Sequence, residues 1–586
     1  MKLTPQELEY AKILSDPVLF AKHFFNWEAR WYQVEMLRSK SLRKVARAGR
    51  RIGKCLHKDS RVMTSSGPVP VEKLFSMKHR PSILTFDEKT QKILETSRYI
   101  VMNNGVKPVY KLTTKSGRTN IVTGNHPFLV IGEEGSLDWK ELDELEVGSR
   151  IAAPSSYKGL IKGKSVGSRK ARLLGYLCGD EGTNYTNAIR FSNIDDGILN
   201  DLRDILSDYN CLLNDIGNGS GDYSIVSIAG PNEVVNLSRK HGIQEKLSIE
   251  KRVPDVVMAG TESDIANFLG AYWDCDGWVS SSKKTYDSAH KTPAVEVGCC
   301  SGSERLARDI HHLLLRLGII SLLKPKKVIY NEEPRIYWTV CIHDIESITK
   351  FANTIPLVSK KKEDMQSALS ILADKNPNGN RYMETIPREV WTYIKNVQGG
   401  LGLTNQQVCE DGGPHARLRT EYSISRDKVL TYSNNLGRDK YLEALANSDI
   451  LWDEIVSIEY EGDSETYDLT VSETHTLIAD DIISHNTDVI CIHAVWYAYT
   501  NKNAALLIAT PYENQVNLIF SRMREFLKDC PEISGSIVIN RRNPNYIEFG
   551  NGSRIQGFTA GTKSGAEGGS IRGQKADWIY LDKHAS

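Results

Sequence analysis

The chain has 586 residues, a formal net charge of +1 and 40% hydrophobic residues. This length exceeds what one hydrophobic core holds, so we expect several domains of a soluble, globular protein. No apolar stretch is long enough to span a membrane, the N-terminus lacks an apolar signal region, and the ten cysteines include no Cys-x-x-Cys pair. We therefore expect a cytoplasmic, reducing location without disulfides, zinc or membrane contact.

The first flank, residues 1–54, combines helices with a basic run. The sequence from Pro5 to about Phe25 is typical of one or two amphipathic helices. Basic residues without any acidic one follow between Arg38 and Lys54. Such a run alone is typical of a solvated helix face. This one leads into a phosphate-binding pattern, which favours contact with nucleotide phosphates.

That phosphate-binding pattern is split. Residues 47–54 end on Gly-Lys, and a P-loop needs a Ser or Thr directly after the Lys, because its hydroxyl holds the magnesium of the nucleotide. Cys55 stands there instead, whereas Thr487 follows a His-Asn pair far along the chain. Deleting residues 55–486 restores Gly-Lys-Thr and a continuous strand, loop and helix.

The segment to be deleted has its own chemistry. It begins with a Cys and ends on His-Asn before a hydroxyl residue. Short alternating runs with turn signals predict a compact all-β fold in residues 55–155 and 441–486. The two ends, with motifs at 71–74, 123–126 and 471–486, resemble an intein, a segment that excises itself and joins its flanks. The resemblance implies a Hint-like splicing domain.

The resemblance also implies a rearrangement that needs no cofactor. The Cys55 thiol attacks the carbonyl of Lys54 and forms a thioester. The Thr487 hydroxyl then takes over the N-terminal flank, the side chain of Asn486 cyclises and cleaves the chain, and the ester rearranges to an amide. His126 would protonate the first leaving nitrogen. The residues that match assisting positions of the family are Thr123, His126, Asp468, His475 and His485.

Residues 156–372 contain an internal repeat of apolar helices. Residues 173–180 and 268–277 each hold small residues four positions apart, followed by an acid, Asp180 or Asp276. Small residues at that spacing share one helix face and let two helices approach closely, which would bring both carboxylates to one end of a shared seam. Two carboxylates there would hold Mg²⁺ for phosphodiester hydrolysis.

The repeat resembles the LAGLIDADG homing endonucleases, α+β proteins with two pseudo-symmetric halves that cut long double-stranded DNA sites. The resemblance implies magnesium and a pseudo-symmetric monomer. The first copy departs from the family at Glu181, where Gly is usual. Candidate assisting lysines, which would otherwise contact DNA phosphates, are Lys324, Lys326 and Lys327. Residues 373–440 are compatible with a DNA-binding accessory region and equally with a linking region.

The second flank, residues 487–586, is typical of an α/β protein. Residues 504–510 predict a buried strand, and a helix follows from about 512 to 528. Another apolar strand ends on Asp582, close to the expected magnesium. Strand, helix and strand in this order fit the core of a P-loop ATPase.

Together the flanks resemble the ATPase of phage large terminase subunits, the DNA-packaging motors. The resemblance implies binding of ATP and Mg²⁺, with DNA as the partner after splicing. The implied nucleotide-binding residues are Gln33, Arg50, Gly53, Lys54, Thr487 and Asp582. Lys583 stands where a catalytic Glu is expected, and the sequence stops at Ser586. We therefore expect the flanks, joined or not, to turn over ATP inefficiently.

Two alternatives remain open. One is a DNA-translocating ATPase with a large structural insertion, which predicts a single intact chain that binds ATP. The other is a splicing-competent intein whose endonuclease has become a binding or structural module, as the departure at Glu181 allows. An intact-mass measurement after expression separates the first alternative from splicing, because excision produces two new polypeptides.

Overall fold

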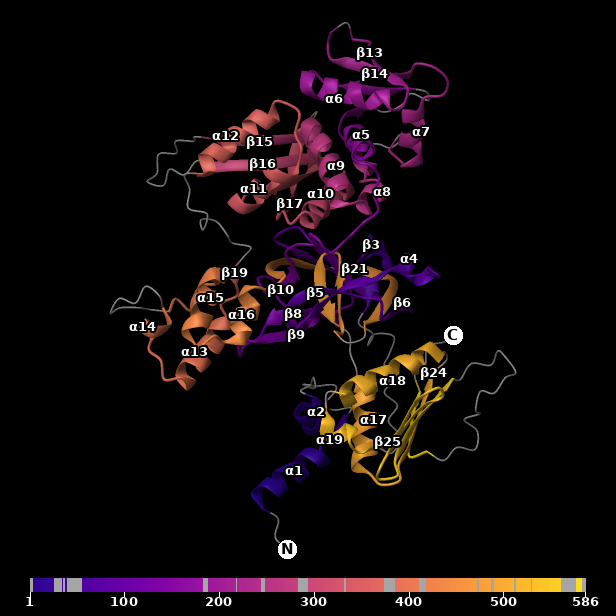
Figure 1. The fold of residues 1–586 in the computed structure, drawn as a ribbon, viewed down its shortest axis with the longest axis vertical. Coiled ribbons are helices and arrows are strands. Elements are labelled where there is room, and N and C mark those ends of the chain that lie inside the picture. Colours follow the sequence, from indigo (N-terminus) through magenta and orange to yellow (C-terminus); the bar gives the residue numbers. More distant parts are fainter. Residues whose placement is uncertain are drawn as a thin grey trace, which may run out of the picture. The chain divides into compact units, whose positions relative to one another are not determined.

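The computed structural model divides the chain into two units, residues 1–53, 470–475 and 486–586, and residues 54–469 and 476–485 (Figure 1). The described residues are 4–25, 34, 37–38, 55–182, 188–217, 219–243, 248–282, 294–330, 333–373, 385–409, 418–471, 474–485, 489–510, 513–528, 530–559 and 576–581. Outside them lie seven candidate site residues: Gln33, Arg50, Gly53, Lys54, Asn486, Thr487 and Asp582.

The splicing region is built from two antiparallel β sheets, as its alternating sequence predicts. The first has the order β1-β7-β6-β21-β10, with β1 Leu56–His57, β7 Thr119–Val122, β6 Tyr99–Thr114, β21 Ile450–Val471 and β10 Arg150–Pro154. The second has the order β5-β4-β2-β22-β23-β8-β9, with β5 Lys92–Thr96, β4 Ile83–Asp87, β2 Arg61–Thr64, β22 Thr476–Ala479, β23 Ile482–His485, β8 Pro127–Ile131 and β9 Leu137–Glu141.

Short elements complete this region. Strand β3 (Gly67–Pro70) pairs with β2 and leads into helix α4 (Val71–Ser76), and the 3₁₀ helix η1 (Leu142–Glu144) follows β9. Buried and half-buried residues alternate along β7, as expected for a strand with one face on the core. Strand β8 is buried at all five residues, because both of its faces are covered.

The region between the two halves of the splicing domain folds as a repeat, which confirms the internal duplication expected from the sequence. Its first half contains α5 (Ser168–Asp180), β11 (Glu181–Gly182), β12 (Ile189–Ser192), α6 (Asp196–Ser207), β13 (Cys211–Asp215), β14 (Asp222–Ser227) and α7 (Glu233–Lys240). Its second half contains α9 (Glu262–Asp276), β15 (Gly277–Ser282), β16 (Ala294–Ser301), α10 (Glu304–Arg316), β17 (Leu322–Tyr330), β18 (Glu333–Ile342) and α11 (Ile345–Thr354).

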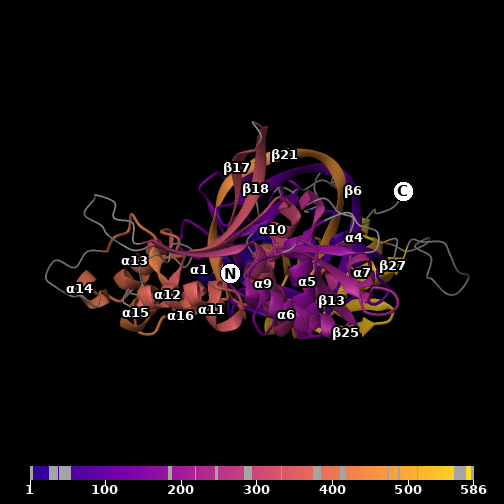
Figure 2. The same cartoon turned by 90° about the horizontal axis from the view of Figure 1, so that it is seen from above.

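The two halves share one topology. Their four-stranded sheets have the orders β11-β12-β14-β13 and β15-β16-β18-β17, so each sheet repeats the other strand for strand. Helices α5 and α9 lie side by side between them (Figures 1 and 2) and belong to one continuous core. Three further elements complete the region: η2 (Ser248–Glu250), α8 (Asp255–Met258) and α12 (Lys361–Ala373).

A small helical region precedes the last part of the splicing domain. It contains β19 (Thr385–Ile386), α13 (Val390–Gly400), α14 (Asn405–Val408), β20 (Ile424–Ser425), α15 (Arg426–Asn435) and α16 (Lys440–Ala446). Its apolar side chains, among them Trp391 and Ile394, share a core with Leu84, Phe86 and Trp452 of the splicing sheets. Burial of this common surface fixes the helical region to the splicing domain.

The unit that contains the flanks is an α/β fold. It contains α1 (Pro5–Ser15), α2 (Pro17–Phe25), α17 (Val489–Thr500), β24 (Ala505–Thr510), α18 (Glu513–Lys528), α19 (Pro531–Ser534), β25 (Ile537–Arg542), β26 (Asn545–Phe549), β27 (Arg554–Thr559) and β28 (Trp578–Leu581). The sheet order is β25-β26-β27-β24-β28, and β24 runs parallel to both of its neighbours. The two N-terminal helices and the strand and helix expected at 504–528 are confirmed.

In this unit α1 begins at a capping motif, and α2 packs into the core. Thr4 caps α1, because its hydroxyl accepts a hydrogen bond from the Glu7 N–H while the Glu7 carboxylate accepts one from the Thr4 N–H. Phe20 of α2 is fully buried in a core that includes Ile492 and Val495 of α17. Segments from both ends of the chain therefore build one core.

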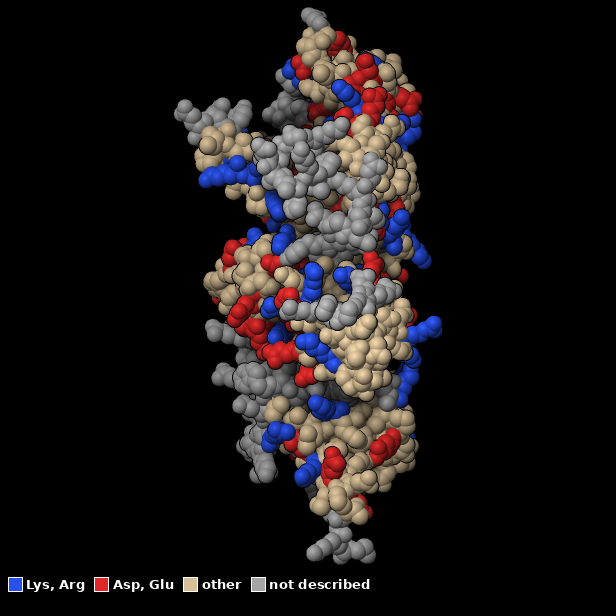
Figure 3. Space-filling model, turned by 90° about the vertical axis from the view of Figure 1, so that its left-hand side faces the viewer, with Lys and Arg blue, Asp and Glu red and all other residues tan. Residues whose placement is uncertain are grey.

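The surface carries both signs of charge, in keeping with the net charge of +1. Figure 3 shows Lys and Arg interspersed with Asp and Glu on the face it presents. Throughout the described part of the chain, every helix falls short of the length and apolarity that crossing a bilayer requires.

Candidate splicing centre and carboxylate pair

Cys55 directly precedes β1, and its thiol is fully buried. Two donors from β6 approach its sulfur: Lys107 Nζ lies 3.1 Å from Sγ and Asn104 Nδ2 lies 3.0 Å from it. Burial raises the pKa of the Cys55 thiol and the negative charge of Asp468 raises it further, whereas Lys107 and Asn104 oppose the rise. The net pKa is raised, so the thiol is held protonated with two donors ready to stabilise a thiolate.

Neither Asn104 nor Lys107 was among the candidate residues expected from the sequence. Lys107 is 4% exposed, while its neighbour Val106 is 61% exposed. Lys107 therefore shares the inward face of β6 with Val109, two positions on. The sequence signal for this burial is that Lys107 falls on the same alternate positions of the strand as the buried valines.

The backbone amide of Cys55, which is the junction amide expected to be cleaved, is bound by Thr123. The Cys55 N–H donates to Thr123 Oγ1 at 3.1 Å, and the Thr123 N–H donates to the Cys55 carbonyl at 3.1 Å. The Thr123 hydroxyl donates in turn to Asn125 Oδ1 at 2.8 Å. Because its proton is used there, the Thr123 hydroxyl presents a lone pair to the junction nitrogen.

His126 closes the turn that begins at Thr123. Its N–H donates to the Thr123 carbonyl at 2.9 Å, and its ring is buried with its centroid 5.4 Å from that of Phe128. The turn therefore joins Thr123, which binds the N-terminal junction, to His126. The structure therefore places both residues of the 123–126 motif in one turn.

The strand that leads to the C-terminal junction runs beside the same turn. Strand β23 ends at His485 and pairs with β8 through Ser484 and Phe128. Since β8 leaves the 123–126 turn at once, the antiparallel register directs the end of β23 toward that turn. The side chain of His485 lies outside the described part of the structure.

Asp468 and His475 come from the last part of the splicing domain. Strand β1 pairs with β21 at Leu56 and Tyr467, which brings Asp468 next to Cys55, in accord with its effect on the thiol pKa. His475 is buried and has a φ of 58°, in the left-handed region that His tolerates better than most residues. It precedes Thr476, whose hydroxyl donates to the Phe86 carbonyl at 2.6 Å.

The second candidate site lies where α5 and α9 end. A Cβ atom added to Gly175 would lie 2.3 Å from the Phe268 carbonyl oxygen, and one added to Gly179 would lie 2.7 Å from Cys275 Cβ. The expected close approach of the two helices is therefore confirmed. It brings Asp180 and Asp276 to the same end of the seam.

The two carboxylates influence each other. Asp276 is exposed at the surface, yet surrounding protein atoms partly desolvate it; this desolvation and the charge of Asp180 raise its pKa to about 6. Asn193 Nδ2 donates to Asp180 Oδ2 at 2.6 Å and orients that carboxylate. The side chain of Glu181 lies outside the described part of the structure.

Two lysines that were not expected from the sequence lie at the helix ends. Lys251 Nζ donates to the Cys178 carbonyl at the end of α5, 3.2 Å away, and Lys361 Nζ donates to the Trp273 carbonyl near the end of α9, 3.0 Å away. Both lower the pKa of Asp276. They match the general preference for cations at helix C-termini. The lysines expected from the sequence to assist, Lys324, Lys326 and Lys327, lie exposed on β17.

The fold and the site define an autoprocessing β domain, in which both junction strands meet at one turn, with a duplicated α+β domain nested inside it. Residues 64–486 match the family model described as the intein splicing domain. The chain belongs to the intein family.

Several known proteins are similar to parts of the chain. The replicative DNA helicase DnaB of Rhodothermus marinus is 27% identical over 495 residues, which cover 80% of this chain and 50% of that protein. The crystal structure of the Ssp DnaB mini-intein variant M86 is 32% identical, with a TM-score of 0.16, over 18% of this chain and 62% of that chain.

The crystal structure of the meganuclease I-SmaMI bound to uncleaveable DNA is 12% identical, with a TM-score of 0.25, over 40% of this chain and 97% of that chain. The chain spans about half the length of the curated relatives that it matches first.

Proposed function

We propose that the chain excises residues 55–486 and joins residues 1–54 to 487–586. The observation that carries this proposal is the pair of hydrogen bonds between Cys55 and Thr123, which fixes the junction amide beside the buried thiol. Cys55 Sγ attacks the Lys54 carbonyl carbon, the carbon–nitrogen bond breaks, and a thioester forms. Holding the amide still lowers the entropy lost on reaching the transition state.

Two protons must move in this first step. Asp468, whose negative charge raises the pKa of the thiol, receives the thiol proton. His126 supplies a proton to the leaving nitrogen. Lys107 and Asn104 stabilise the sulfur while its negative charge develops. This assigns Asp468 to the first step in addition to the later ones that the family resemblance suggests.

The later steps use the C-terminal junction. The Thr487 hydroxyl attacks the thioester and takes over the N-terminal flank. The side-chain nitrogen of Asn486 then attacks its own carbonyl carbon, assisted by His485 and His475, and releases the Thr487 amine. That amine attacks the neighbouring ester, and a peptide bond joins the flanks.

Intact-mass analysis after expression tests the proposal. Splicing yields one product of residues 55–486 and one ligated product, both of predictable mass. A Cys55→Ala variant should yield no ligated product, because no thioester forms. If the unmodified chain stays whole under reducing conditions and binds ATP, the splicing proposal is wrong and the chain is an ATPase with a structural insertion.

We further propose that the nested domain cuts double-stranded DNA with Mg²⁺, as a pseudo-symmetric monomer. The support comes from the two helices that end on Asp180 and Asp276 and from the raised pKa of Asp276. A divalent cation between the carboxylates would relieve their repulsion, so the residues present fit Mg²⁺. Bound there, the ion would activate water and stabilise the leaving oxygen.

The residues around the pair would serve that reaction. Asp180, oriented by Asn193, and Asp276 would hold the metal, while Lys251 and Lys361 would contribute positive charge near the cleaved phosphate. The expected DNA target is the coding sequence of the uninterrupted Gly-Lys-Thr junction. A plasmid carrying that sequence should be linearised, and Asp180→Asn or Asp276→Asn should prevent cutting without affecting splicing. Absence of cutting by the unmodified protein would favour a binding or structural role.

The joined flanks are proposed to form the nucleotide-binding part of a DNA-handling ATPase. Parallel strands β24, β27 and β28, with α17 and α18, support an α/β nucleotide-binding core. Both a terminase and a helicase of the DnaB kind fit this arrangement. Binding of Mg²⁺-ATP to the ligated product, and loss of binding in Lys54→Ala, test the proposal. The terminase alternative predicts stimulation by linear double-stranded DNA, whereas the helicase alternative predicts stimulation by single strands.

A further inference from the structure

The turn of the β22–β23 hairpin contacts the nested domain through buried charges. The turn residues Asp480 and Asp481 have φ values of 50° and 61°, the left-handed pair that a two-residue hairpin requires. Strand β23 leaves this turn and ends at His485, next to the C-terminal junction. Whatever fixes the turn therefore fixes the strand that leads to residue 486.

The carboxylate of Asp481 is bound by one residue of the nested domain and by one residue of the segment that leads into that domain. Its carboxylate lies 3.0 and 3.1 Å from Nδ1 of His312, on α10, and accepts a hydrogen bond of 2.9 Å from the Tyr157 hydroxyl. Burial alone would raise the pKa of Asp481, but His312 and the arginines Arg118 and Arg61 hold it well below its usual range. The carboxylate is thus kept ionised in a buried setting.

A second set of contacts starts from Asp480. Its Oδ1 accepts a hydrogen bond of 3.0 Å from the Arg61 N–H of β2, and the Arg61 guanidinium donates to Asp309 of α10 at 2.6 Å. The side chains of Arg61 and Asp309 are only 13% and 2% exposed. Asp309 also accepts from the Val253 N–H at 3.3 Å. Removing Asp309 would take away the shorter of the two carboxylate contacts of the buried Arg61 guanidinium, since its other contact, with Asp480, is 3.9 Å long, and this loss is unfavourable.

Further hydrogen bonds, both to backbone carbonyls, connect the nested domain with the splicing sheets. The Leu323 N–H of β17 donates to the Ser116 carbonyl at 2.8 Å, and the Arg308 guanidinium donates to the Gly117 carbonyl at 2.9 Å. A Cβ atom at Gly117 would lie 2.3 Å from the Leu323 carbonyl oxygen. The nested domain therefore fits closely against two separate turns of the splicing sheets and cannot shift without breaking both sets of contacts.

We propose that helix α10 of the nested domain positions the C-terminal splice junction, with Asp309 and His312 as positioning residues for the step that cleaves after residue 486. This rests on the proposed splicing function. The buried side chains of Asp309 and His312 on α10 bind Arg61 and the turn residue Asp481. Strand β23 leaves that turn and ends at His485, beside the 123–126 turn. The nested domain is then a working part of the splicing machinery as well as an endonuclease.

The test uses the full chain and follows the two junctions separately. Added thiol cleaves the thioester at the N-terminal junction, and mass spectrometry counts the products of cleavage at each end. His312→Ala and Asp309→Asn should slow C-terminal cleavage about tenfold or more, because each removes a buried partner from a charged group that holds the turn. Thiol-induced N-terminal cleavage should change less than about twofold, since the Cys55–Thr123 contact is untouched.

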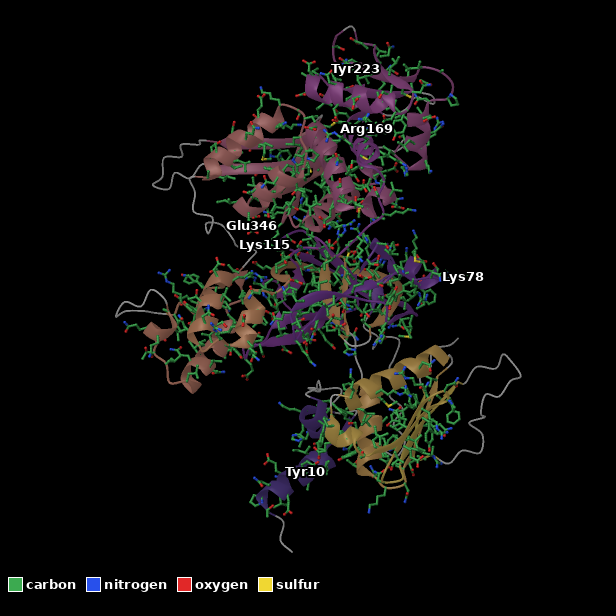
Figure 4. The ribbon with its side chains drawn as sticks, viewed as in Figure 1. Tyr10, Lys78, Lys115, Arg169, Tyr223 and Glu346 are labelled. Atoms are coloured by element: carbon green, nitrogen blue, oxygen red, sulfur yellow. The ribbon has the colours of Figure 1, made fainter. Side chains whose placement is uncertain are left out.

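Two milder variants keep the test independent of global folding. Tyr157→Phe removes one hydrogen bond to Asp481 and should slow C-terminal cleavage about threefold. His312→Gln keeps a donor to Asp481 and should recover part of the rate lost in His312→Ala. The matched control is Asp204→Asn on α6, an exposed partner of Arg169 (labelled in Figure 4), which should change neither junction.

Hydrogen exchange supplies a second measurement. In a Cys55→Ala background, which cannot form the thioester, His312→Ala should speed amide exchange in residues 476–485 and leave α5 and α9 unchanged. Equal slowing at both junctions, no slowing at either, or unchanged hairpin exchange would overturn the positioning role. A wild-type chain that cleaves at neither junction would instead contradict the splicing function itself, so the two failures are distinguishable.

Discussion

The amide nitrogen of Cys55 lies 3.1 Å from the hydroxyl oxygen of Thr123, and the reverse backbone bond, from the Thr123 N–H to the Cys55 carbonyl, has the same length. These two bonds join residues 68 positions apart in the sequence. They place the bond expected to be broken at the start of the turn that also carries His126.

Thr123→Val should slow thioester formation about 10- to 100-fold, because the junction nitrogen loses its acceptor while the side-chain shape is kept. C-terminal cleavage should continue. Thiol-induced release of the N-terminal flank measures the effect. Thr119→Val on the neighbouring strand β7 is the matched control and should behave as the unmodified chain. Equal rates in Thr123→Val and the control would show that the hydrogen bond has no role in the reaction.

Lys107→Met should shift the pH dependence of thioester formation to higher pH. Burial and Asp468 already raise the pKa of the Cys55 thiol, and Lys107 opposes that rise. Without the lysine the pKa rises further, so a higher pH is needed for the same thiolate fraction. The rate of thiol-induced cleavage between pH 6 and 9 measures the shift. A profile that moves to lower pH, or not at all, contradicts the assignment.

Asp276→Asn should stabilise the nested domain at neutral pH while it prevents DNA cutting. The native pKa of Asp276, about 6, exceeds the ordinary value of 3.8. The folded state therefore binds the proton more tightly, and the free energy of unfolding falls as pH rises from about 4 to 6. Solvent screens the exposed side chain, so Asn should raise the free energy of unfolding by only about 1 kcal/mol at pH 7.

Thermal unfolding at pH 4 and pH 7 checks this. The difference between Asp276→Asn and the unmodified domain should be present at pH 7 and nearly absent at pH 4, where the aspartate is protonated in the folded state and about half protonated in the unfolded state. Added Mg²⁺ should raise the melting temperature of the unmodified domain more than that of the variant, provided the two carboxylates share the ion. An equal effect on both would place the cation elsewhere.

Gly175→Ala should destabilise the nested domain by about 1–3 kcal/mol, because its Cβ would lie 2.3 Å from the Phe268 carbonyl oxygen and force α5 and α9 apart. The matched control is Gly399→Ala in helix α13, where a Cβ meets no atom within 4 Å and alanine favours the helix. Denaturant unfolding of both variants measures the difference. DNA cutting should fall with Gly175→Ala, since Asp180 and Asp276 would separate.

Features with a local signature were accessible from the sequence. The alternation of the splicing strands, the capping of α1 and the two apolar helices with small residues each depend on neighbours a few positions apart. The duplication predicted the seam between Gly175 and Ala271 and the two acids at its end. The split Gly-Lys-Thr pattern and the Cys and Asn at the proposed ends supplied the family resemblance, which the family match supports.

What the sequence by itself determined is therefore the set of elements and the candidate reactive residues. Only the tertiary structure decided which distant side chains surround them: Lys107 and Asn104 at the Cys55 sulfur, Lys251 and Lys361 at the ends of the paired helices, and Asp309 and His312 at the β22–β23 turn. The physical reason is that periodicity reports which face of an element is buried. Which partner meets that face depends on contacts between segments tens to hundreds of residues apart, and these leave no local pattern.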